Sequence, residues 1–279
     1  MMRARPKPTN LRTVSTSVAR LGQHTREERE DRLAIEEPLE IRLGGRNISV
    51  VMRTPGDDHE LAAGLLFTEG ILTGRQEVER IEHRTDPENP RLCNVIDVTP
   101  RAAVVGLSER GWQRNFVSSS SCGLCGKLTI ESVHLHAPAV DDGLRVSVRV
   151  LLRLPDRLRS AQAGFDETGG LHAAGLFDAE GRLLCLREDI GRHNAVDKII
   201  GAALLNDELP LSGRILMVSG RTSFEIVQKA LMARIPFVAA VSAASSLAVE
   251  LAESSRMGLV GFLRGEGMNA YAGAERIVS

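Results

Sequence analysis

The C-terminal part of the chain repeats a strand, a short loop and a helix, and this repetition constrains the fold more than any other feature. Apolar runs at 214–218, 236–241 and 258–263 are typical of buried strands, and the segments between them have helical patterns. Strands linked through a helix and short loops pair in parallel, with right-handed crossovers. The sequence therefore predicts a C-terminal three-layer α/β domain over residues 138–279.

The segments that precede this repeat fit the same domain. A helical pattern over 151–165 is followed by two strands, 171–177 and 182–187, whose linker carries residues typical of a hairpin turn. A turn at 189–193 then opens a helix that is expected to run to about Leu205. With 279 residues, 43% of them hydrophobic, the chain is long and apolar enough to bury the core of two domains.

The N-terminal part predicts a basic tail and then a smaller domain. The first 26 residues hold several arginines and two prolines but no acid, so we expect a disordered basic tail over residues 1–30. Strand patterns at 38–43 and 47–52 flank two glycines, as in a β-hairpin, and residues 54–58 are expected to cap a helix. The predicted N-terminal α+β domain covers residues 31–137.

The predicted topology indicates where a ligand would bind. In open α/β sheets, ligands settle beyond the carboxyl ends of the parallel strands. Three loops, at 219–223, 242–246 and 264–267, follow those ends, and two of them open helices whose N–H groups and hydroxyls suit an anion. We expect a pocket for a phosphorylated, nucleotide-like ligand, with ordinary helix capping as the alternative. Its first loop consists of Ser219, Gly220, Arg221, Thr222 and Ser223.

Several other polar residues lie in these patterns without a clear role. Asp189 and His193 share one Gly-containing turn, which suits a base with its orienting carboxylate as well as it suits a polar helix cap. His172 lies inside an apolar strand, which favours a satisfied histidine at the rim of the core. Cys93 and Cys185 lie in strand patterns, where we expect buried and unreactive thiols.

Two further cysteines lie in a segment that cannot build a core. Cys122 and Cys125 are three positions apart in the run 118–127, which is otherwise mostly serine and glycine. Such a composition is typical of a mobile loop, so both thiols are expected to be reachable. The loop is therefore the predicted place of covalent chemistry.

Three chemistries fit this C-x-x-C pair. A zinc site would need two more ligands, for which His134 and His136 are available at an unusual spacing. A dithiol oxidoreductase would place the pair at the start of a helix after a strand, and the serine run before it is a poor strand. A covalent carrier, in which Cys122 accepts a group and the loop moves it, suits a mobile segment best.

Charge and composition exclude several classes of protein. The net charge is −1 and the isoelectric point is about 6.7, so a general nucleic-acid or membrane-surface binder is not expected. One Trp and one Tyr are too few for base-stacking platforms. Neither a secretory signal nor an apolar run of membrane-spanning length is present in the sequence, and we expect a cytoplasmic protein with reduced cysteines.

Seven motifs follow one another along the chain, and their order is highly specific. The chain resembles the formate dehydrogenase accessory sulfurtransferase family, FdhD, from about Leu33 onward. The motifs that carry this resemblance are Thr54-Pro55-Gly56-Asp57-Asp58, Phe67-Thr68-Glu69-Gly70-Ile71, Ser121-Cys122-Gly123-Leu124-Cys125-Gly126, Gly169-Gly170-Leu171-His172-Ala173, the run from Glu188 to Lys198, Ser219-Gly220-Arg221-Thr222-Ser223-Phe224-Glu225 and Gly261-Phe262-Leu263-Arg264-Gly265.

The resemblance implies a function for the thiol loop. Family members are understood to take persulfide sulfur from a cysteine desulfurase and to pass it to the molybdenum cofactor. That cofactor, Mo-bis-molybdopterin guanine dinucleotide, then enters the catalytic subunit of formate dehydrogenase. By this resemblance Cys122 is the persulfide carrier and Cys125 its helper, and the protein needs no metal of its own. The resemblance also implies a homodimer.

The resemblance further implies the fold and the cofactor site. The C-terminal domain is expected to be similar to the cytidine deaminase fold. Deaminase chemistry is not expected, because the segment at His172 lacks the glutamate that activates the zinc-bound water. The family's cofactor-binding segment corresponds here to Phe262, Leu263, Arg264, Gly265, Glu266 and Gly267.

Overall fold

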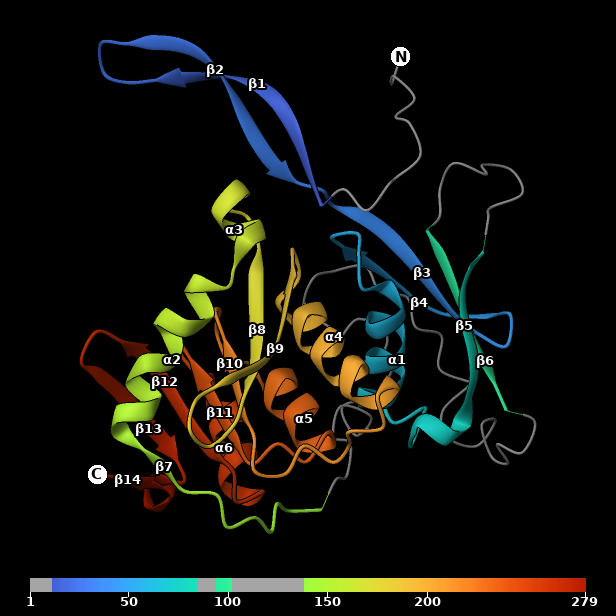
Figure 1. Cartoon of the computed structure of the whole chain (residues 1–279), viewed down its shortest axis with the longest axis vertical. Coiled ribbons are helices and arrows are strands. Elements are labelled where there is room, and N and C mark those ends of the chain that lie inside the picture. The colour runs from blue at the N-terminus through green and yellow to red at the C-terminus, as the bar shows by residue number, and fades with distance from the viewer. Residues whose placement is uncertain (1–11, 85–93, 102–137) are drawn as a thin grey trace.

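The computed structural model describes residues 12–84, 94–101 and 138–279. A six-stranded sheet in the order β13-β12-β11-β10-β8-β9 forms the centre of the C-terminal half (Figure 1). Its three middle strands pair in parallel, and the outer strands pair antiparallel, which confirms the predicted repeat. The strands are β8 (His172–Phe177), β9 (Leu183–Asp189), β10 (Ile215–Val218), β11 (Phe237–Ala240), β12 (Gly258–Arg264) and β13 (Gly267–Ala272).

Helices cover both faces of this sheet. Side chains of β10 and β11 alternate between two hydrophobic clusters, one under α4, α5 and α6 and one under α2. The predicted three-layer α/β architecture is thereby confirmed. None of the helices in the described segments is long and apolar enough to cross a bilayer. They are α2 (Val148–Ser160), α3 (Ala163–Thr168), α4 (Arg192–Leu205), α5 (Phe224–Met232) and α6 (Ser246–Ser254).

The N-terminal half contains a four-stranded sheet and one helix. The sheet has the order β4-β3-β6-β5, and the predicted hairpin joins its first two strands through Gly44 and Gly45. Both glycines have positive φ angles, 57° and 81°, which glycine adopts without strain. The elements are β3 (Glu37–Leu43), β4 (Arg46–Arg53), α1 (Asp58–Thr68), η1 (Arg75–Glu77), β5 (Val78–Arg84) and β6 (Val95–Pro100).

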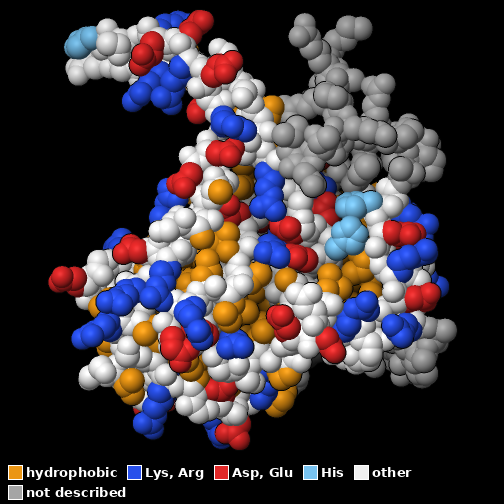
Figure 2. All heavy atoms as spheres, in the orientation of Figure 1, with side chains coloured by type: hydrophobic (Ala, Val, Ile, Leu, Met, Phe, Trp, Pro, Cys, Tyr) orange, Lys and Arg blue, Asp and Glu red, His pale blue; other side chains and the backbone are white. Residues whose placement is uncertain are grey.

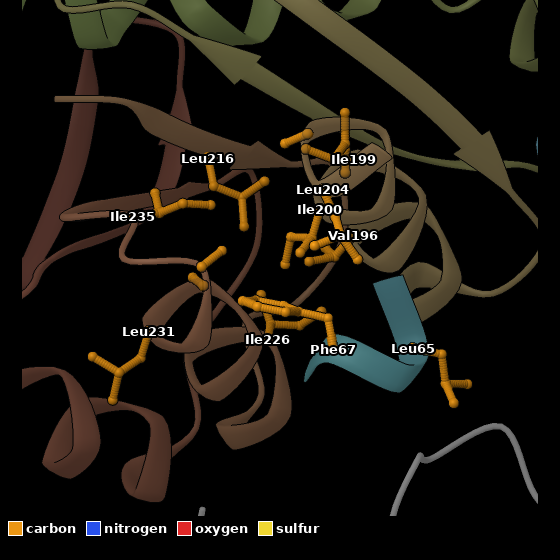
Figure 3. Packing of buried hydrophobic residues seen from close by; sticks show 14 of the residues in the cluster. Leu65, Phe67, Val196, Ile199, Ile200, Leu204, Leu216, Ile226, Leu231 and Ile235 are labelled. Atoms are coloured by element: carbon orange, nitrogen blue, oxygen red, sulfur yellow. The ribbon is translucent and has the colours of Figure 1, made fainter. Parts of the chain in front are cut away.

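The two predicted domains share one hydrophobic core, because α1 packs directly on α4. Gly64 of α1 and Gly201 of α4 face each other, and a Cβ atom on either would clash with the backbone of the other helix. Side chains from both halves, including Phe67 of α1 and Val196 and Ile226 of α4 and α5, lie in the same cluster (Figure 3). The position of the N-terminal half is therefore determined by close helix packing.

A two-stranded ribbon corrects the prediction of a disordered tail over residues 1–30. Strands β1 (Thr13–Leu21) and β2 (Arg26–Ala34) pair antiparallel and project from the body, with charges of both signs along them (Figures 1 and 2). Alternating β-branched residues in β1 favour a strand. Arg32 anchors the base, because it donates to Thr13 Oγ1 at 2.7 Å and pairs with Glu167 of α3 at 3.2 Å. Residues 1–11 lie outside the described part.

Two short elements complete the described chain. Strand β7 (Val146–Ser147) pairs in parallel with β14 (Ile277–Val278), next to the turn η3 (Ala274–Arg276). This contact joins the two ends of the C-terminal half, at the start of α2.

Candidate functional site

The loops that follow β10, β11 and β12 meet at one edge of the sheet, as the topology predicted. The N–H of Thr222 donates to the carbonyl of Ala243 at 3.0 Å, and the N–H of Ser245 donates back to the carbonyl of Thr222 at 3.0 Å. The N–H of Phe262 donates to the carbonyl of Ser242 at 3.0 Å. Backbone hydrogen bonds thus hold the first two loops side by side and join the second loop to the last part of β12.

The predicted segment 262–267 is the end of a β-hairpin, and its residues have different environments. Phe262 has a φ angle of 50°, and the guanidinium of Arg264 lies 5.5 Å from the centre of its ring. The side chain of Leu263 is fully buried in the cluster under α2, so that side chain is not available to a ligand. Residues 265–267 are exposed at the turn between β12 and β13.

The hydroxyls of the loop 219–223 divide into two groups. Ser219 Oγ accepts from the N–H of Ala173 at 2.9 Å, and Ser223 Oγ donates to Glu225 at 3.0 Å, so both stabilise the fold. Thr222 is almost completely buried, and among the described residues its Oγ1 has no hydrogen-bond partner. A buried hydroxyl without a partner costs stability unless a ligand or water binds it.

The side chains of His172 and Arg192 pack against Gly220 in the same loop. A Cβ atom on this glycine would lie 3.4 Å from His172 Nδ1 and 3.7 Å from Arg192 Cδ, which shows how closely both side chains approach the backbone. Burial, and then the charges of Arg192 and His193, lower the pKa of His172, so that its ring is neutral at pH 7. Arg192 Nε is buried without a partner among the described residues, and Arg221 is exposed.

Two of these groups are donors of the kind that bind phosphate oxygens. Thr222 and Arg192 each have a buried donor without a partner among the described residues. Arginine binds phosphate oxygens through charge-assisted hydrogen bonds. Arg192 and His172 were not predicted as pocket residues. For Arg192 the sequence signal is its position beside His193 at a predicted helix start. For His172 the signal is the pair of glycines just before it.

Asp189 is not the orienting partner of His193, which corrects that interpretation. Its fully buried carboxylate pairs with Lys198 Nζ at 2.8 Å and accepts from Asn194 Nδ2 and the N–H of Gly191, both at 2.8 Å. It also accepts from the N–H of Thr54 at 3.2 Å. The carboxylate therefore holds the turn before α4 against the N-terminal half.

The segment 54–58 has a different role from the predicted helix cap. Asp57 is the N-cap of α1, but its side chain makes no capping hydrogen bond and pairs instead with Arg12 at 2.5 Å. Thr54 is fully buried, and its Oγ1 accepts from the N–H of Ile190 at 3.2 Å. Lys198, a lysine in an otherwise apolar helical pattern, was the sequence signal for a buried ion pair here.

His193 contacts Glu225, which the sequence did not predict as a site residue. Its Nε2 lies 2.9 Å from Glu225 Oε2 and 3.2 Å from Ser223 Oγ. Burial alone would raise the pKa of Glu225, but the hydrogen bond and charge of His193 outweigh this and lower it. Because serine and carboxylate share one ring nitrogen, this is not the Ser-His-acid arrangement of a hydrolase, in which they occupy opposite nitrogens.

The predicted thiol site lies outside the described residues. This applies to Cys122 and Cys125, to the candidate zinc ligands His134 and His136, and to Cys93. Cys185 lies in β9 as predicted, but it is half-buried and not buried as expected, and this partial burial raises the pKa of its thiol. In the segments that the structure covers, no group of three or more His, Cys, Asp or Glu side chains is placed to hold a metal ion.

Comparison with known proteins identifies the family. The model of the FdhD/NarQ family matches residues 34–278. The chain belongs to this family. The match begins at the end of β2, so most of the β1–β2 ribbon precedes it.

Individual relatives are similar to this protein along almost the whole chain. A sulfur carrier protein FdhD from Streptomyces avermitilis is 51% identical over 270 residues, which cover 95% of both chains. One from Mycolicibacterium paratuberculosis is 53% identical over 254 residues, or 89% of this chain and 93% of the relative. The crystal structure of a formate dehydrogenase accessory protein from Desulfotalea psychrophila superimposes with a TM-score of 0.74 at 26% identity, covering 95% of this chain and 99% of that one.

Proposed function

We propose that this protein is a sulfurtransferase that carries sulfur for formate dehydrogenase. Cys122 accepts persulfide sulfur from a cysteine desulfurase and transfers it to Mo-bis-molybdopterin guanine dinucleotide, which binds at the sheet edge as the substrate. The observation that carries the proposal is a pair of buried donors, Thr222 Oγ1 and Arg192 Nε, that have no partner among the described residues, at the predicted edge of a chain whose relatives are sulfur carriers.

The accepting step is a thiol exchange that needs no oxidant. The Cys122 thiolate attacks the terminal sulfur of the desulfurase persulfide. A new sulfur–sulfur bond forms at Cys122, the sulfur–sulfur bond of the donor breaks, and the desulfurase cysteine leaves as a thiolate. A cysteine in a segment whose serine and glycine content predicts a mobile loop suits this exchange, and Cys125 lies close enough in sequence to protect or share the carried sulfur.

The cofactor's phosphate groups give the sheet edge its role. In this proposal, Thr222, Arg192 and the backbone of Gly220 bind phosphate oxygens. The hairpin end 262–267 lies beside them through the hydrogen bond between Phe262 and Ser242, where it can contact the guanine-bearing part. In the transfer step the sulfur–sulfur bond at Cys122 breaks and Cys122 leaves as a thiolate, while the molybdenum of the substrate would supply two electrons and bind the sulfur as sulfide.

Mass spectrometry of the whole chain tests the carrier function. Incubation with a cysteine desulfurase and cysteine should add sulfur to the wild type and not to Cys122→Ala. The Cys125→Ala variant shows whether the second thiol also carries sulfur. Stoichiometric zinc without any adduct would instead favour a zinc-stabilised binding module. Turnover of a protein disulfide that depends on both cysteines would favour a thiol–disulfide oxidoreductase.

Calorimetric titration with guanosine diphosphate (GDP) tests the binding site separately. The wild type should bind GDP, and Arg192→Gln should weaken binding by about tenfold, the value of one charge-assisted hydrogen bond. Wild-type protein that shows no binding of GDP would contradict the proposed pocket without bearing on the thiol chemistry.

A further inference from the structure

The β1–β2 ribbon has no hydrophobic core of its own. It is a separate two-stranded sheet, and residues 19–30 are exposed throughout. A sheet of two strands is at best marginally stable in water. The ion pair of Arg32 with Glu167 fixes the base of the ribbon on α3, and from there the ribbon points away from the body (Figure 1). Its free part therefore lies away from this chain's own six-stranded sheet, and a surface of another molecule would stabilise it.

The two edges of the ribbon differ in charge. Strand β2 has seven charged residues in the run from Arg26 to Arg32, which protects its outer edge from pairing with another strand. Strand β1 has one charged residue, Arg20, and consists mostly of small, hydroxyl and β-branched residues that favour a strand. The outer edge of β1 is therefore the edge that is open to a further strand.

The six-stranded sheet also ends in an unprotected edge. Strand β9 is its last strand, and the run Leu183-Leu184-Cys185-Leu186 has no charge and no buried residue. Leu184 is 49% exposed. Apolar side chains gather on the surface where β9 and α4 lie side by side (Figures 1 and 2). Uncharged edges and apolar patches of this kind mark interaction sites.

A hollow of about 370 Å³ opens beside β9, between the sheet and α4. The exposed carboxylate of Glu208 lines it and has no ion-pair partner among the described residues. Arg187 lines it too, but its guanidinium is already paired with Glu60. An apolar side chain with a cation next to it would therefore fit this hollow. Its apolar lining comes from β8, β9 and α4 and consists of Leu176, Leu184, Leu186, Ile199, Ala202 and Ala203.

One face of the ribbon carries this combination of side chains. Val18 of β1 lies directly opposite Arg29 of β2, and residues that are opposite each other in an antiparallel pair share a face. Arg29 is exposed, and no residue that the structure describes forms an ion pair with it. Ala19 lies on the other face, opposite Glu28. The face of Val18 and Arg29 thus matches the hollow in both polarity and charge.

We propose that the ribbon is an arm that binds a second copy of this chain. Its strand β1 adds to the outer edge of the partner's β9, with Val18 in the partner's hollow and Arg29 beside the partner's Glu208. Main-chain hydrogen bonds then join the two uncharged edges, and side chains of the arm fill the space beside α4. Because each copy has both the arm and the hollow, two identical contacts close the assembly as a dimer.

Sedimentation velocity of the full chain tests the arm. The wild type should sediment as a dimer in the micromolar range. Leu184→Glu and Val18→Glu should each weaken dimerisation by at least about a hundredfold, because each places a carboxylate in the apolar contact. A wild type that stays a monomer, or a dimer that both variants leave intact, would overturn the proposal.

Exchange of two charges tests which residues meet. Arg29→Glu and Glu208→Arg should each weaken dimerisation by about tenfold, because each sets like charges against one another in both contacts of the dimer. The double variant should recover most of the wild-type affinity, since it restores the ion pair with its signs exchanged. A double variant in which the two losses simply add would contradict the proposed contact.

Two matched variants control for the added charge. Leu247 is 39% exposed on α6, which packs against α5, β12 and β13 and not at the β9 edge. Leu247→Glu should leave the dimer intact. Glu28→Arg changes a charge on the other face of the ribbon and should also leave it intact. If these controls weakened dimerisation as much as Leu184→Glu and Arg29→Glu, the effect would not be specific to this contact and the proposal would fail.

Discussion

The middle and the N-terminal end of α4 differ in how their buried polar groups are paired. In the middle, Gly201 allows backbone contact with α1, and the buried Asp197 is hydrogen-bonded by Lys229 and Thr68 at 2.8 Å. At the N-terminal end, Arg192 keeps a buried nitrogen without a partner among the described residues. One helix thus holds the two halves of the molecule together and also brings one donor without a partner among the described residues to the sheet edge. Changes in the middle should affect stability, and changes at the end should affect binding.

The largest effect is expected where the two helices touch. Gly201→Ala places a methyl group against the backbone carbonyl of Glu60, which no side-chain rotation can relieve. We expect a loss of more than about 4 kcal/mol in the free energy of unfolding, or no folded protein. Gly143→Ala is the matched control, because nothing lies within 4 Å of its added Cβ. Urea denaturation of both variants would measure the difference, and similar values for the two would contradict the close helix packing.

The next effect is expected at the buried ion pair. Burial alone would lower the pKa of Lys229, but the charge of Asp197 outweighs it and raises that pKa. Lys229→Met leaves the Asp197 carboxylate buried without its counter-charge and should cost about 3–5 kcal/mol in the free energy of unfolding. The double variant Lys229→Met/Asp197→Leu removes both charges and should recover much of the lost free energy of unfolding. The control is the surface ion pair of Arg80 and Glu82. There, Arg80→Met should lower the free energy of unfolding by less than about 1 kcal/mol.

A smaller effect, with a defined pH dependence, is expected at Glu225. Its pKa is lower in the folded protein than the ordinary 4.5, so its contribution is present above that value and is lost as the pH falls through the folded pKa. Glu225→Gln should therefore cost about 1–2 kcal/mol at pH 7. The gap between variant and wild type should close when unfolding is measured at acidic pH, below the folded pKa. A gap that stays constant with pH would exclude an ionised Glu225 as its cause.

The smallest effect on stability is expected at Thr222. Replacement by Val keeps the shape and removes a hydroxyl that has no partner among the described residues, so the free energy of unfolding should change by less than about 1 kcal/mol or rise slightly. Binding of GDP should nevertheless fall by about tenfold. A large loss of stability in Thr222→Val would contradict this expectation. It would show that the hydroxyl stabilises the fold, as the buried groups in the middle of α4 do.

Local patterns along the chain predicted the elements but not all of their contacts. The apolar runs identified β10, β11 and β12, and their order placed three loops at one edge, because parallel strands end on the same side. The ribbon of residues 13–34 was missed, since its anchor is Arg32 against Glu167, more than a hundred residues away. The local pattern predicts a helix cap at Thr54 for the same reason, since its partner Asp189 lies in the other half of the chain.

The sequence by itself determined the α/β class, the family and the order of the site loops, because strand and helix periodicity and short motifs are local properties of the chain. Only the tertiary structure decided which polar groups are satisfied. His193 and Glu225 are far apart along the chain, and they meet because β9 and β10 run in the same direction on either side of β8, so the helices that follow them begin at the same edge of the sheet. The same folding leaves Thr222 Oγ1 without a partner among the described residues. Pairing of buried polar groups depends on distances between distant segments, and these are set by packing.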